Sequence, residues 1–295
     1  MASSNEHEAG ERCLRDGVSD GLKPLETLDL SRVESVDDMV RGLGDTAFAA
    51  RALGEAADTL EAMIRDPECH VVCTMSGAMT IAKMGLVLCD MIDGGWVQSI
   101  VSTGALMAHG FVEATGRAHF KHDGRFNDAE LFSRGYDRVY DTLELEQSLD
   151  DVEPIVAEAL DSFRPGEGYG SFELHDRLGA WLAEHAPGRG ILKSAHAERV
   201  PVYVPAFTDS EIGLDVALNA RRKRREDLEP PRYDGFRDLE AYTRQIEAAP
   251  RIGIFTVGGG VPRNWAQQVA PYLDIIKSRL QEDVPVRRFR YGVRL

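Results

Sequence analysis

The stretch IGIFTVGGGVPRNWAQQ, residues 252–268, decides the fold class. An apolar run rich in β-branched residues stops at Gly258, Gly259 and Gly260, and Pro262 then suits the first turn of a helix. Glycines lower stability inside regular structure, so three together between a strand and a helix need a physical reason. They leave room for backbone N–H groups to approach a phosphate at a helix N-terminus. A tight turn needed for close packing explains the triplet equally well.

Four further apolar runs predict strands beside the one at residues 251–257. They cover residues 71–75, 97–102, 200–206 and 286–291. Near-continuous apolar strands are buried on both faces, which is typical of a parallel sheet. Ligands of such sheets bind beyond the carboxyl ends of the strands. Small or hydroxylic residues follow four of the five runs at that end, namely Ser76-Gly77, Thr103-Gly104, Thr208-Asp209 and the glycine triplet. The sequence therefore predicts an α/β fold with a cofactor cleft at this edge of the sheet.

The rest of the chain divides into predicted helices and loops. Helical patterns cover residues 36–65, 78–92, 148–163 and 172–186. A further helix begins after Thr103, whereas residues 117–140 are charged and predict a loop. We expect residues 1–20 to form a flexible N-terminal tail and residues 21–295 to form a single domain.

Charge and hydropathy exclude several classes of protein. The formal net charge of −15 argues against a general nucleic-acid binder, which needs a basic surface. The basic run at residues 221–225 is followed at once by Glu226 and Asp227, so we interpret it as a solvated helix face. No apolar stretch reaches the roughly 20 residues that span a bilayer, and the polar N-terminus does not match a secretory signal. We expect a soluble cytoplasmic protein without nucleic-acid or membrane partners.

The cysteines and histidines do not predict a metal site. Cys69, Cys73 and Cys89 match neither a disulfide framework nor a C-x-x-C pair, and we expect buried free thiols. His119 and His122 lie three residues apart in the charged segment without a firm third ligand. We therefore expect them to be solvated surface histidines, and we expect no metal.

Several segments, spread in order over residues 25–292, resemble the deoxyhypusine synthase family and in particular its deoxyhypusine synthase-like branch. The matching segments are Asp37–Arg41, Ala47–Ala56, Ser76-Gly77-Ala78-Met79, Val101-Ser102-Thr103-Gly104-Ala105 with His109, Arg138-Val139-Tyr140-Asp141, Pro205-Ala206-Phe207-Thr208-Asp209-Ser210 and Gly258-Gly259-Gly260-Val261-Pro262.

The resemblance implies a Rossmann-like parallel sheet flanked by helices, of the deoxyhypusine synthase type, that binds NAD. It also implies a homotetramer with active sites at subunit interfaces. In the family's reaction, NAD takes a hydride from the carbon beside a polyamine's secondary amine. An enzyme lysine captures the resulting imine, and the aminobutyl group then passes to an acceptor amine, which can be a protein lysine.

The resemblance assigns cofactor-contacting positions to the strand ends. They are Ser76, Gly77, Ala78, Met79, Thr103, Gly104, Ala105, Asp209, Gly258, Gly259 and Gly260. Asp209 would bind a ribose hydroxyl or an amide, and it can also serve as the N-cap of a helix that begins at Glu211. The positions that would face the polyamine are His109, Asp215, Asn264 and Gln268.

Three of these positions depart from the family pattern. Gly110 stands where the pattern T-G-A-x-x-x-H-D has an aspartate, so the acidic partner of His109 is missing from the sequence. Asp215 lies one place beyond the family's usual acid, and Asn264 stands where eukaryotic-type relatives have a histidine. These departures fit a relative that handles small diamines such as putrescine, as a homospermidine-type synthase does, in place of spermidine and a protein lysine.

The family's nucleophilic lysine lies in a Trp-Gly-Lys segment beyond the last predicted strand. None of the six lysines among these 295 residues follows Trp-Gly, so the sequence identifies no catalytic residue. Two interpretations stay open. In the first, the sequence is a truncated form that lacks the family's C-terminal segment. In the second, it is a non-catalytic paralogue, which either binds NAD and a polyamine or lends half a site to another subunit.

Overall fold

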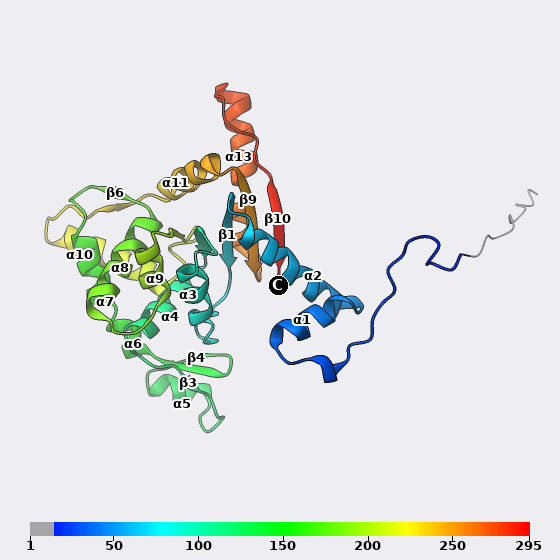
Figure 1. Cartoon of the computed structure of the whole chain (residues 1–295). Helices are drawn as coiled ribbons and strands as arrows, with labels where there is room; N and C mark the ends of the chain where they lie inside the picture. The colour runs from blue at the N-terminus through cyan, green and yellow to red at the C-terminus, as the bar shows by residue number, and fades with distance from the viewer. Residues whose placement is uncertain (1–14) are drawn as a thin grey trace, which may run out of the picture. The chain divides into compact units, whose positions relative to one another are not determined.

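The computed structural model describes residues 15–295 and divides into two compact units, one ending at Asp58 and one running from Thr59 to Leu295 (Figure 1). The tail boundary expected after residue 20 and the single domain expected over residues 21–295 stay predictions. Residues 1–14 of the predicted tail lie outside the described residues.

The first unit contains the 3-10 turn η1 (Leu30–Arg32), α1 (Val36–Gly44) and most of α2 (Phe48–Arg65). The Ser35 hydroxyl caps α1 by accepting a hydrogen bond from the Asp38 backbone N–H at 3.1 Å. The helix predicted over residues 36–65 is thus two helices. They pack so closely within the unit that a Cβ on Gly54 would overlap the backbone of Gly44.

The second unit is built on a five-stranded parallel sheet, as the apolar runs predict. Its strands, in the spatial order β10-β9-β1-β2-β7, are β10 (Phe289–Arg294), β9 (Arg251–Val257), β1 (Cys69–Met75), β2 (Ser99–Ser102) and β7 (Val202–Tyr203). The bounds of β9 match the prediction. The paired part of β7 is shorter than residues 200–206, and β10 begins three residues later than residue 286.

Helices cover the sheet because its central strands are apolar on both faces. On one face, Val72, Val101 and Ile254 form a core with Tyr242 of α11 and Ala266 of α12. Val71 and Cys73 of β1 alternate with Val72 and are buried as well, so the opposite face is also covered. Cys69, Cys73 and Cys89 are buried free thiols, as predicted.

The remaining helices connect these strands. They are α3 (Gly85–Asp93), α4 (Gly104–Ala114), α6 (Glu146–Asp150), α7 (Glu153–Asp161), α8 (Ser171–His185), α9 (Ile191–Glu198), α10 (Glu211–Arg225), α11 (Gly235–Ala248), α12 (Gly260–Gln267), α13 (Val269–Ile275) and the π-helical turn η2 (Ile276–Leu280). A second, two-stranded parallel sheet pairs β6 (Gly168–Tyr169) with β8 (Arg232–Tyr233). The helix predicted over residues 148–163 is divided into α6 and α7, whereas α8 agrees closely with its prediction.

The prediction of a loop over residues 117–140 was wrong. This segment contributes β3 (Phe120–Lys121), α5 (Asp128–Ser133) and β4 (Tyr136–Val139), which join β5 (Thr142–Leu145) in an antiparallel sheet ordered β3-β5-β4. Both residues of β3 are exposed, so the strand carries no apolar alternation that a sequence pattern could detect.

The prediction that a helix begins at residue 78 was also wrong, because α3 begins only at Gly85. Residues 78–84 form a loop closed by its own hydrogen bonds, among them Lys83 N–H to the Thr80 carbonyl at 2.9 Å. The Thr80 hydroxyl anchors this loop to α4 by donating to the Leu106 carbonyl at 2.9 Å. A Cβ on Gly110 of α4 would lie 2.9 Å from the Thr80 methyl group. A larger residue at position 110 would therefore require Thr80 or the loop to shift.

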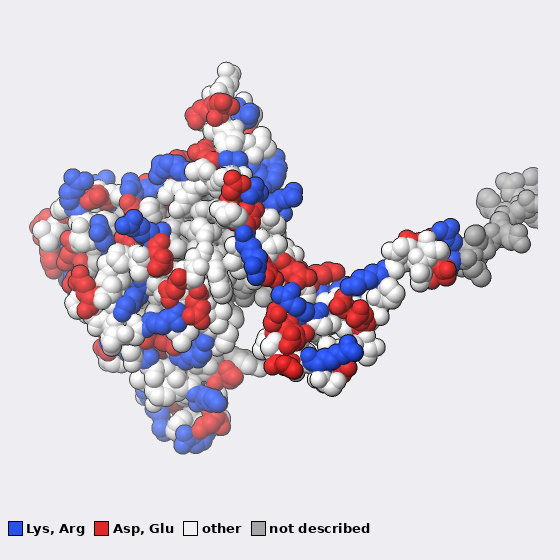
Figure 2. Space-filling view, viewed as in Figure 1, with Lys and Arg blue, Asp and Glu red and all other residues white. Residues whose placement is uncertain are grey.

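On the face shown in Figure 2, Lys and Arg side chains of the described residues are interspersed with Asp and Glu. Among the described residues, no helix combines the length and apolar character that crossing a bilayer requires.

We expect Gly110→Ala to lower the free energy of unfolding by about 1–3 kcal/mol, because the added methyl group overpacks the contact with Thr80. Helix propensity alone acts in the opposite direction, since alanine favours a helix interior by roughly 1 kcal/mol over glycine. Urea unfolding measures the difference, and Thr80→Ser should restore stability by removing the opposing methyl group. Gly188→Ala is the control, because nothing lies within 4 Å of its added Cβ. A Gly110→Ala variant more stable than the parent protein would contradict the packing argument.

Candidate functional site

The carboxyl ends of β1 and β9 meet in a direct contact. Parallel pairing places Met75 beside Val257, so the residues that follow the two strands are adjacent. The Ser76 hydroxyl accepts a hydrogen bond from the Gly259 N–H at 2.9 Å. A Cβ on Gly258, whose φ is +85°, would overlap this hydroxyl oxygen. Close packing is therefore one reason for the glycine triplet.

The ends of β2 and β7 join the same edge. The Thr103 hydroxyl donates to the Gly77 carbonyl at 2.7 Å, which ties the end of β2 to the end of β1. A Cβ on Gly104 would overlap the Ser210 side chain, which follows β7. The four strand ends singled out from the sequence thus touch one another in a chain of contacts.

Two helix N-termini at this edge lack a side-chain cap. Thr103 precedes α4 and makes no side-chain hydrogen bond to its first turn, and Gly259, which precedes α12, has no side chain to cap it. Uncapped N-termini leave backbone N–H groups for an external acceptor such as a phosphate. Gly77 and Gly260 have φ values of +75° and +64°, and nothing lies within 4 Å of where their Cβ atoms would be. This cradle of open glycines and N–H donors fits the phosphates of a dinucleotide.

Asp209 does not cap α10, so that part of the prediction was wrong. Ser210 is the N-cap, and its hydroxyl accepts the Gly213 N–H at 3.1 Å. The exposed Asp209 carboxylate has no hydrogen-bond or ion-pair partner among residues 15–295, while its backbone lies against Gly104. Its role in binding a cofactor stays a prediction.

The predicted cofactor positions that remain are half-buried. Ala78 and Met79 lie in the loop after Ser76-Gly77, and Ala105 lies in the first turn of α4. Arg294 is not among the residues predicted from the sequence, and its Nε donates to the Gly258 carbonyl at 3.0 Å. This guanidinium adds a positive charge beside the glycine triplet.

Two of the predicted polyamine-facing residues, Asn264 and Gln268, are exposed near the end of α12. They lie one turn apart on one side of the helix, because Asn264 accepts the Gln268 backbone N–H. Trp265 between them points to the core and stacks on Tyr242 at 5.1 Å. The structure thus leaves both polar side chains available to a ligand.

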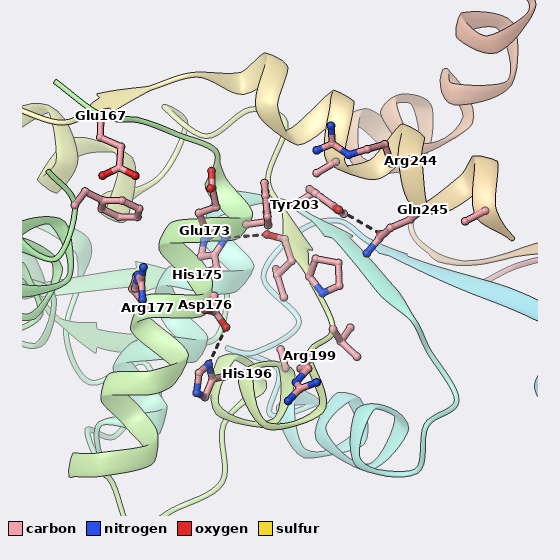
Figure 3. Close-up of a pocket in the computed structure, with 18 residues that line it drawn as sticks. Glu167, Glu173, His175, Asp176, Arg177, His196, Arg199, Tyr203, Arg244 and Gln245 are labelled. Carbon is pink, nitrogen blue, oxygen red and sulfur yellow. Dashed lines mark hydrogen bonds and ion pairs between the residues drawn. The ribbon is translucent and has the colours of Figure 1, made fainter. Parts of the chain in front are cut away.

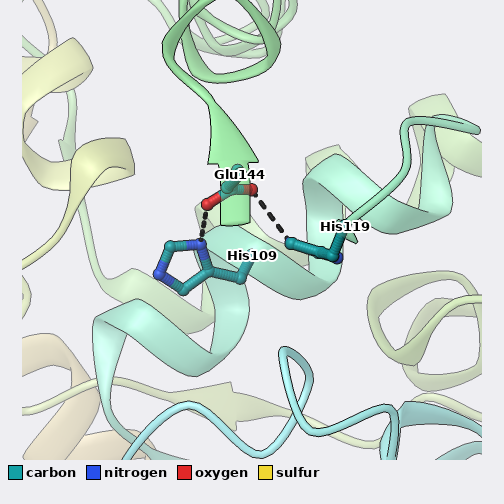
Figure 4. Close-up of side chains that lie close together, drawn as sticks. All are labelled: His109, His119 and Glu144. Atoms are coloured by element: carbon teal, nitrogen blue, oxygen red, sulfur yellow. Dashed lines mark hydrogen bonds and ion pairs between the residues drawn. The ribbon is translucent and has the colours of Figure 1, made fainter. Parts of the chain in front are cut away.

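His109 has an acidic partner that the sequence did not reveal. Its Nδ1 faces Oε2 of Glu144 at 2.6 Å, and the other oxygen of Glu144 accepts a hydrogen bond from His119 Nε2 at 3.0 Å (Figure 4). The Glu144 side chain is 1% exposed. The His109–Glu144 contact is an ion pair outside hydrogen-bonding geometry, and neither facing atom has another partner among the described residues. Glu144 of β5 is therefore the acidic partner of His109, in place of an acid at position 110.

Burial and charge act in opposite directions on this pair. Burial lowers the pKa of His109, but Glu144 outweighs burial and the net pKa is raised, with smaller contributions from Glu211 and Asp137. Burial raises the pKa of Glu144, but the two imidazoles outweigh it and bring the pKa to about 2. The charged His109–Glu144 pair is thus favoured near neutral pH.

Asp215 has no ion-pair partner of its own among the described residues, although Arg222 binds the neighbouring Glu153 at 3.0 Å. The pKa of Asp215 is raised to about 7, first by burial and then by Glu153, Glu211 and Asp150. The pKa of Asp137 is likewise raised by burial, and Glu146 contributes to the shift. Carboxylates held this closely bind a cation favourably, because it removes their mutual repulsion.

The prediction of solvated surface histidines was wrong for His119, whose side chain is fully buried. His109, His119 and Glu144 offer three ligand atoms within 4.8 Å of one another, which is close enough for a metal ion. However, Lys83 Nζ lies 2.9 Å from His119 Nδ1. Because lysine only donates, Nδ1 must accept, and Nε2 then carries the hydrogen that faces Glu144. A metal on Nε2 would displace that hydrogen, so this contact favours a proton-bridged cluster.

A cavity of about 640 Å³ lies elsewhere, beside β7 and between α8, α9 and α11 (Figure 3). Its acids are already paired, since Asp176 binds His196 at 2.7 Å and Glu173 binds Arg237 at 2.7 Å. Arg199 and Arg244 line it without an acidic partner among the described residues. These cationic groups do not suit a polyamine, so the strand ends remain the candidate site.

Comparisons with known proteins gave matches over most of this chain. The family model described as deoxyhypusine synthase matches residues 38–294. "Probable deoxyhypusine synthase 2" of Methanosarcina mazei is 32% identical over 264 residues, covering 89% of this chain and 72% of the relative. The "deoxyhypusine synthase-like protein" of Chlorobaculum parvum is 30% identical over 256 residues, covering 86% of this chain and 72% of the relative.

A solved structure shows the same fold. The crystal structure of a "putative deoxyhypusine synthase" from Entamoeba histolytica superposes with a TM-score of 0.57 at 12% identity, covering 80% of this chain and 82% of the other. The matched family model spans the sheet and every strand end that forms the site. On this evidence the chain belongs to the deoxyhypusine synthase family.

Proposed function

We propose that the protein transfers an aminoalkyl group from a polyamine, such as spermidine or putrescine, to an amine acceptor in an NAD-dependent reaction. The observation that carries the proposal is the convergence of four strand ends and two uncapped helix N-termini near the half-buried carboxylates Glu211 and Asp215 of α10. Family membership supplies the reaction class.

When bound, the dinucleotide supplies a hydride acceptor for the carbon beside a polyamine nitrogen. The N-termini of α4 and α12 would hold its phosphates, with Arg294 adding positive charge. Asp209 is free to accept hydrogen bonds from a ribose or an amide. The close contacts of Gly258 and Gly259 with Ser76 keep these donors fixed before the ligand arrives.

The carboxylates would bind the ammonium groups of the polyamine. Asp215 and Glu211 repel each other in the free protein, so a cation between them gains more energy than one at an isolated carboxylate. His109, held by Glu144, can give or accept a proton at the reacting nitrogen. Asn264 and Gln268 would add neutral hydrogen-bonding groups.

We also propose that the active form is a homotetramer, with a small diamine or a protein lysine as the acceptor. Leu86 and Val87 of α3 are 57% and 55% exposed, and such adjacent apolar side chains support a subunit contact.

A non-catalytic protein that binds NAD and a polyamine is the second candidate. The observation that favours it is that no lysine among these residues follows Trp-Gly. Incubation with NAD and putrescine or spermidine distinguishes the two. A new polyamine product supports transfer, whereas NAD binding without turnover supports the binding protein.

Gly77→Ala should weaken NAD binding at least about tenfold, which corresponds to roughly 1.4 kcal/mol. The new methyl group enters the open space of the cradle, and the positive φ adds backbone strain. Titration calorimetry measures the affinity. Gly95→Ala is the matched control, because Gly95 has φ +69° and equally open space but lies between α3 and β2. Equal NAD affinity in the two variants would rule out the cradle.

Asp215→Asn should stabilise the protein at pH 8 but have little effect at pH 4. A folded pKa of about 7 lies above the unfolded value near 3.8, so the folded state binds the proton more tightly. The free energy of unfolding therefore falls as pH rises through that window, and the full cost of the charge is present above pH 7. Thermal unfolding at both pH values measures the effect.

The same variant tests polyamine binding. Spermidine should raise the Tm of the parent protein at pH 8 by more than that of Asp215→Asn, since the cation relieves the repulsion around Asp215. Glu226→Gln is the control, because it removes an exposed charge at the far end of α10. If spermidine raises the Tm of all three proteins equally, Asp215 is not part of the polyamine site.

A further inference from the structure

The cavity of about 640 Å³ lies at the opposite end of β7 from the cradle (Figure 3). Arg199, Val200 and Pro201 come directly before the strand and line the cavity. Asp209 comes after the strand, and its backbone lies against Gly104 at the cradle. A ligand in the cavity therefore binds separately from a dinucleotide at the strand ends.

Three arginines that line this cavity have no acidic partner among residues 15–295. Arg177 lies on α8, Arg199 directly after α9, and Arg244 on α11, so they come from three separate elements around the cavity (Figure 3). The Arg177 guanidinium carbon lies 5.6 Å from the centre of the Phe163 ring, a cation–π contact that holds it at the cavity wall. Planar guanidinium groups bind phosphate and carboxylate oxygens in pairs, so this lining favours an anion.

The acidic side chains of the cavity do not cancel this positive charge. Each of the three has a basic partner, and the pairs are Glu167–Arg164, Glu173–Arg237 and Asp176–His196. Five arginines and three carboxylates therefore lie at the cavity, which leaves an excess of two positive charges even when His196 is neutral. An anionic ligand is needed to balance them.

A buried histidine adds a neutral acceptor to the lining. His175 is 2% exposed, and its Nδ1 lies 3.0 Å from the Val202 carbonyl oxygen. A carbonyl only accepts, so Nδ1 carries the hydrogen and Nε2 is left as an acceptor. Burial lowers the pKa of His175 to about 4 and outweighs the opposite effect of the Val202 carbonyl, so the ring is neutral near pH 7. Among the described residues Nε2 has no hydrogen-bond partner, and a ligand N–H or O–H group would satisfy it.

Aromatic and aliphatic side chains form the rest of the wall. The rings of Phe172 and Tyr203 lie 5.5 Å apart between their centres, and Phe163 and Pro201 also line the cavity. The Tyr203 hydroxyl donates a hydrogen bond to Gln245 at 3.2 Å, so its polar group is already satisfied. A cavity of this volume, with apolar walls and a few charged groups, is typical of sites for small organic molecules. An anion with a flat organic body therefore fits it better than an inorganic ion alone.

We propose that this cavity binds a small organic anion of about the size of a nucleotide, held by its phosphate or carboxylate oxygens. Arg199 and Arg244 bind the anionic oxygens, while Phe172 and Tyr203 pack against the flat body of the ligand. His175 accepts a hydrogen bond from it. Because the cavity and the cradle lie at opposite ends of β7, this anion and a dinucleotide bind without competing.

Titration calorimetry on the full chain tests the proposal with two anionic probes, ADP for a phosphate ligand and trimesate, an aromatic tricarboxylate, for a carboxylate ligand. Adenosine is the uncharged match of ADP. We expect at least one of the two anions to bind at least about tenfold more tightly than adenosine, because charge-assisted hydrogen bonds to the guanidinium groups supply the affinity. Tighter binding of ADP identifies a phosphate as the ligand's anionic group, and tighter binding of trimesate identifies a carboxylate.

Arginine variants show where the anion binds. Arg199→Gln and Arg244→Gln should each weaken its binding at least about tenfold, since each removes a charged donor. Both arginines are exposed, so neither change disturbs the core. Arg221→Gln is the matched control, because Arg221 is also exposed and has no ion pair among the described residues, but lies on α10 outside the cavity. Gly77→Ala, which alters the cradle, should leave the affinity for the anion unchanged.

Failure of both anions to bind the parent protein would overturn the proposal. Equal affinity for the anion in the parent protein, Arg199→Gln and Arg244→Gln would do the same. Binding that Gly77→Ala weakens and the two arginine variants do not would assign the anion to the cradle and also contradict it. Because these titrations contain no NAD and no polyamine, a protein that fails to bind NAD would overturn the proposed function and leave this result standing.

Discussion

The site depends on one close approach, between the Ser76 hydroxyl and the glycine triplet. Parallel pairing of β1 and β9 over seven residues brings the two strand ends to the same level. Only glycine fits at position 258, because its φ is positive and a Cβ would overlap the hydroxyl oxygen. The Gly259 N–H is then satisfied by Ser76, and the next N–H groups begin α12 without a cap. Packing and ligand binding are therefore two consequences of the same glycines.

Two carboxylates of the site, Glu144 and Asp215, differ in whether positive groups compensate their charge. Glu144 is buried but compensated by two imidazoles, which makes it a fixed part of the structure. The pKa of Asp215 is raised by burial and by neighbouring carboxylates, so a bound cation would stabilise its charged form. A polyamine site needs both, because fixed charges orient the reacting groups while uncompensated ones supply binding energy.

The family pattern and this chain place an acid beside the histidine at position 109 through different residues. Gly110 removes the neighbouring acid of His109 and makes room for the loop that carries Lys83. Glu144 restores an acidic partner from a strand 35 positions along the chain and also binds His119. The loss of one carboxylate and the arrangement of the Lys83 loop are thus linked by packing at Thr80.

The sequence by itself determined the parallel sheet and the small residues at its strand ends, because apolar runs and glycines are local signals that act over a few residues. Only the tertiary structure decided that Ser210 rather than Asp209 caps α10, and that His119 is buried instead of solvated. It also decided the pairing of exposed β3 with β5, which places Glu144 between two histidines. The contacts of His119 with Glu144 and with Lys83 join residues 25 and 36 positions apart. Their formation depends on which segments the fold brings together, and no local pattern of hydrophobicity records that.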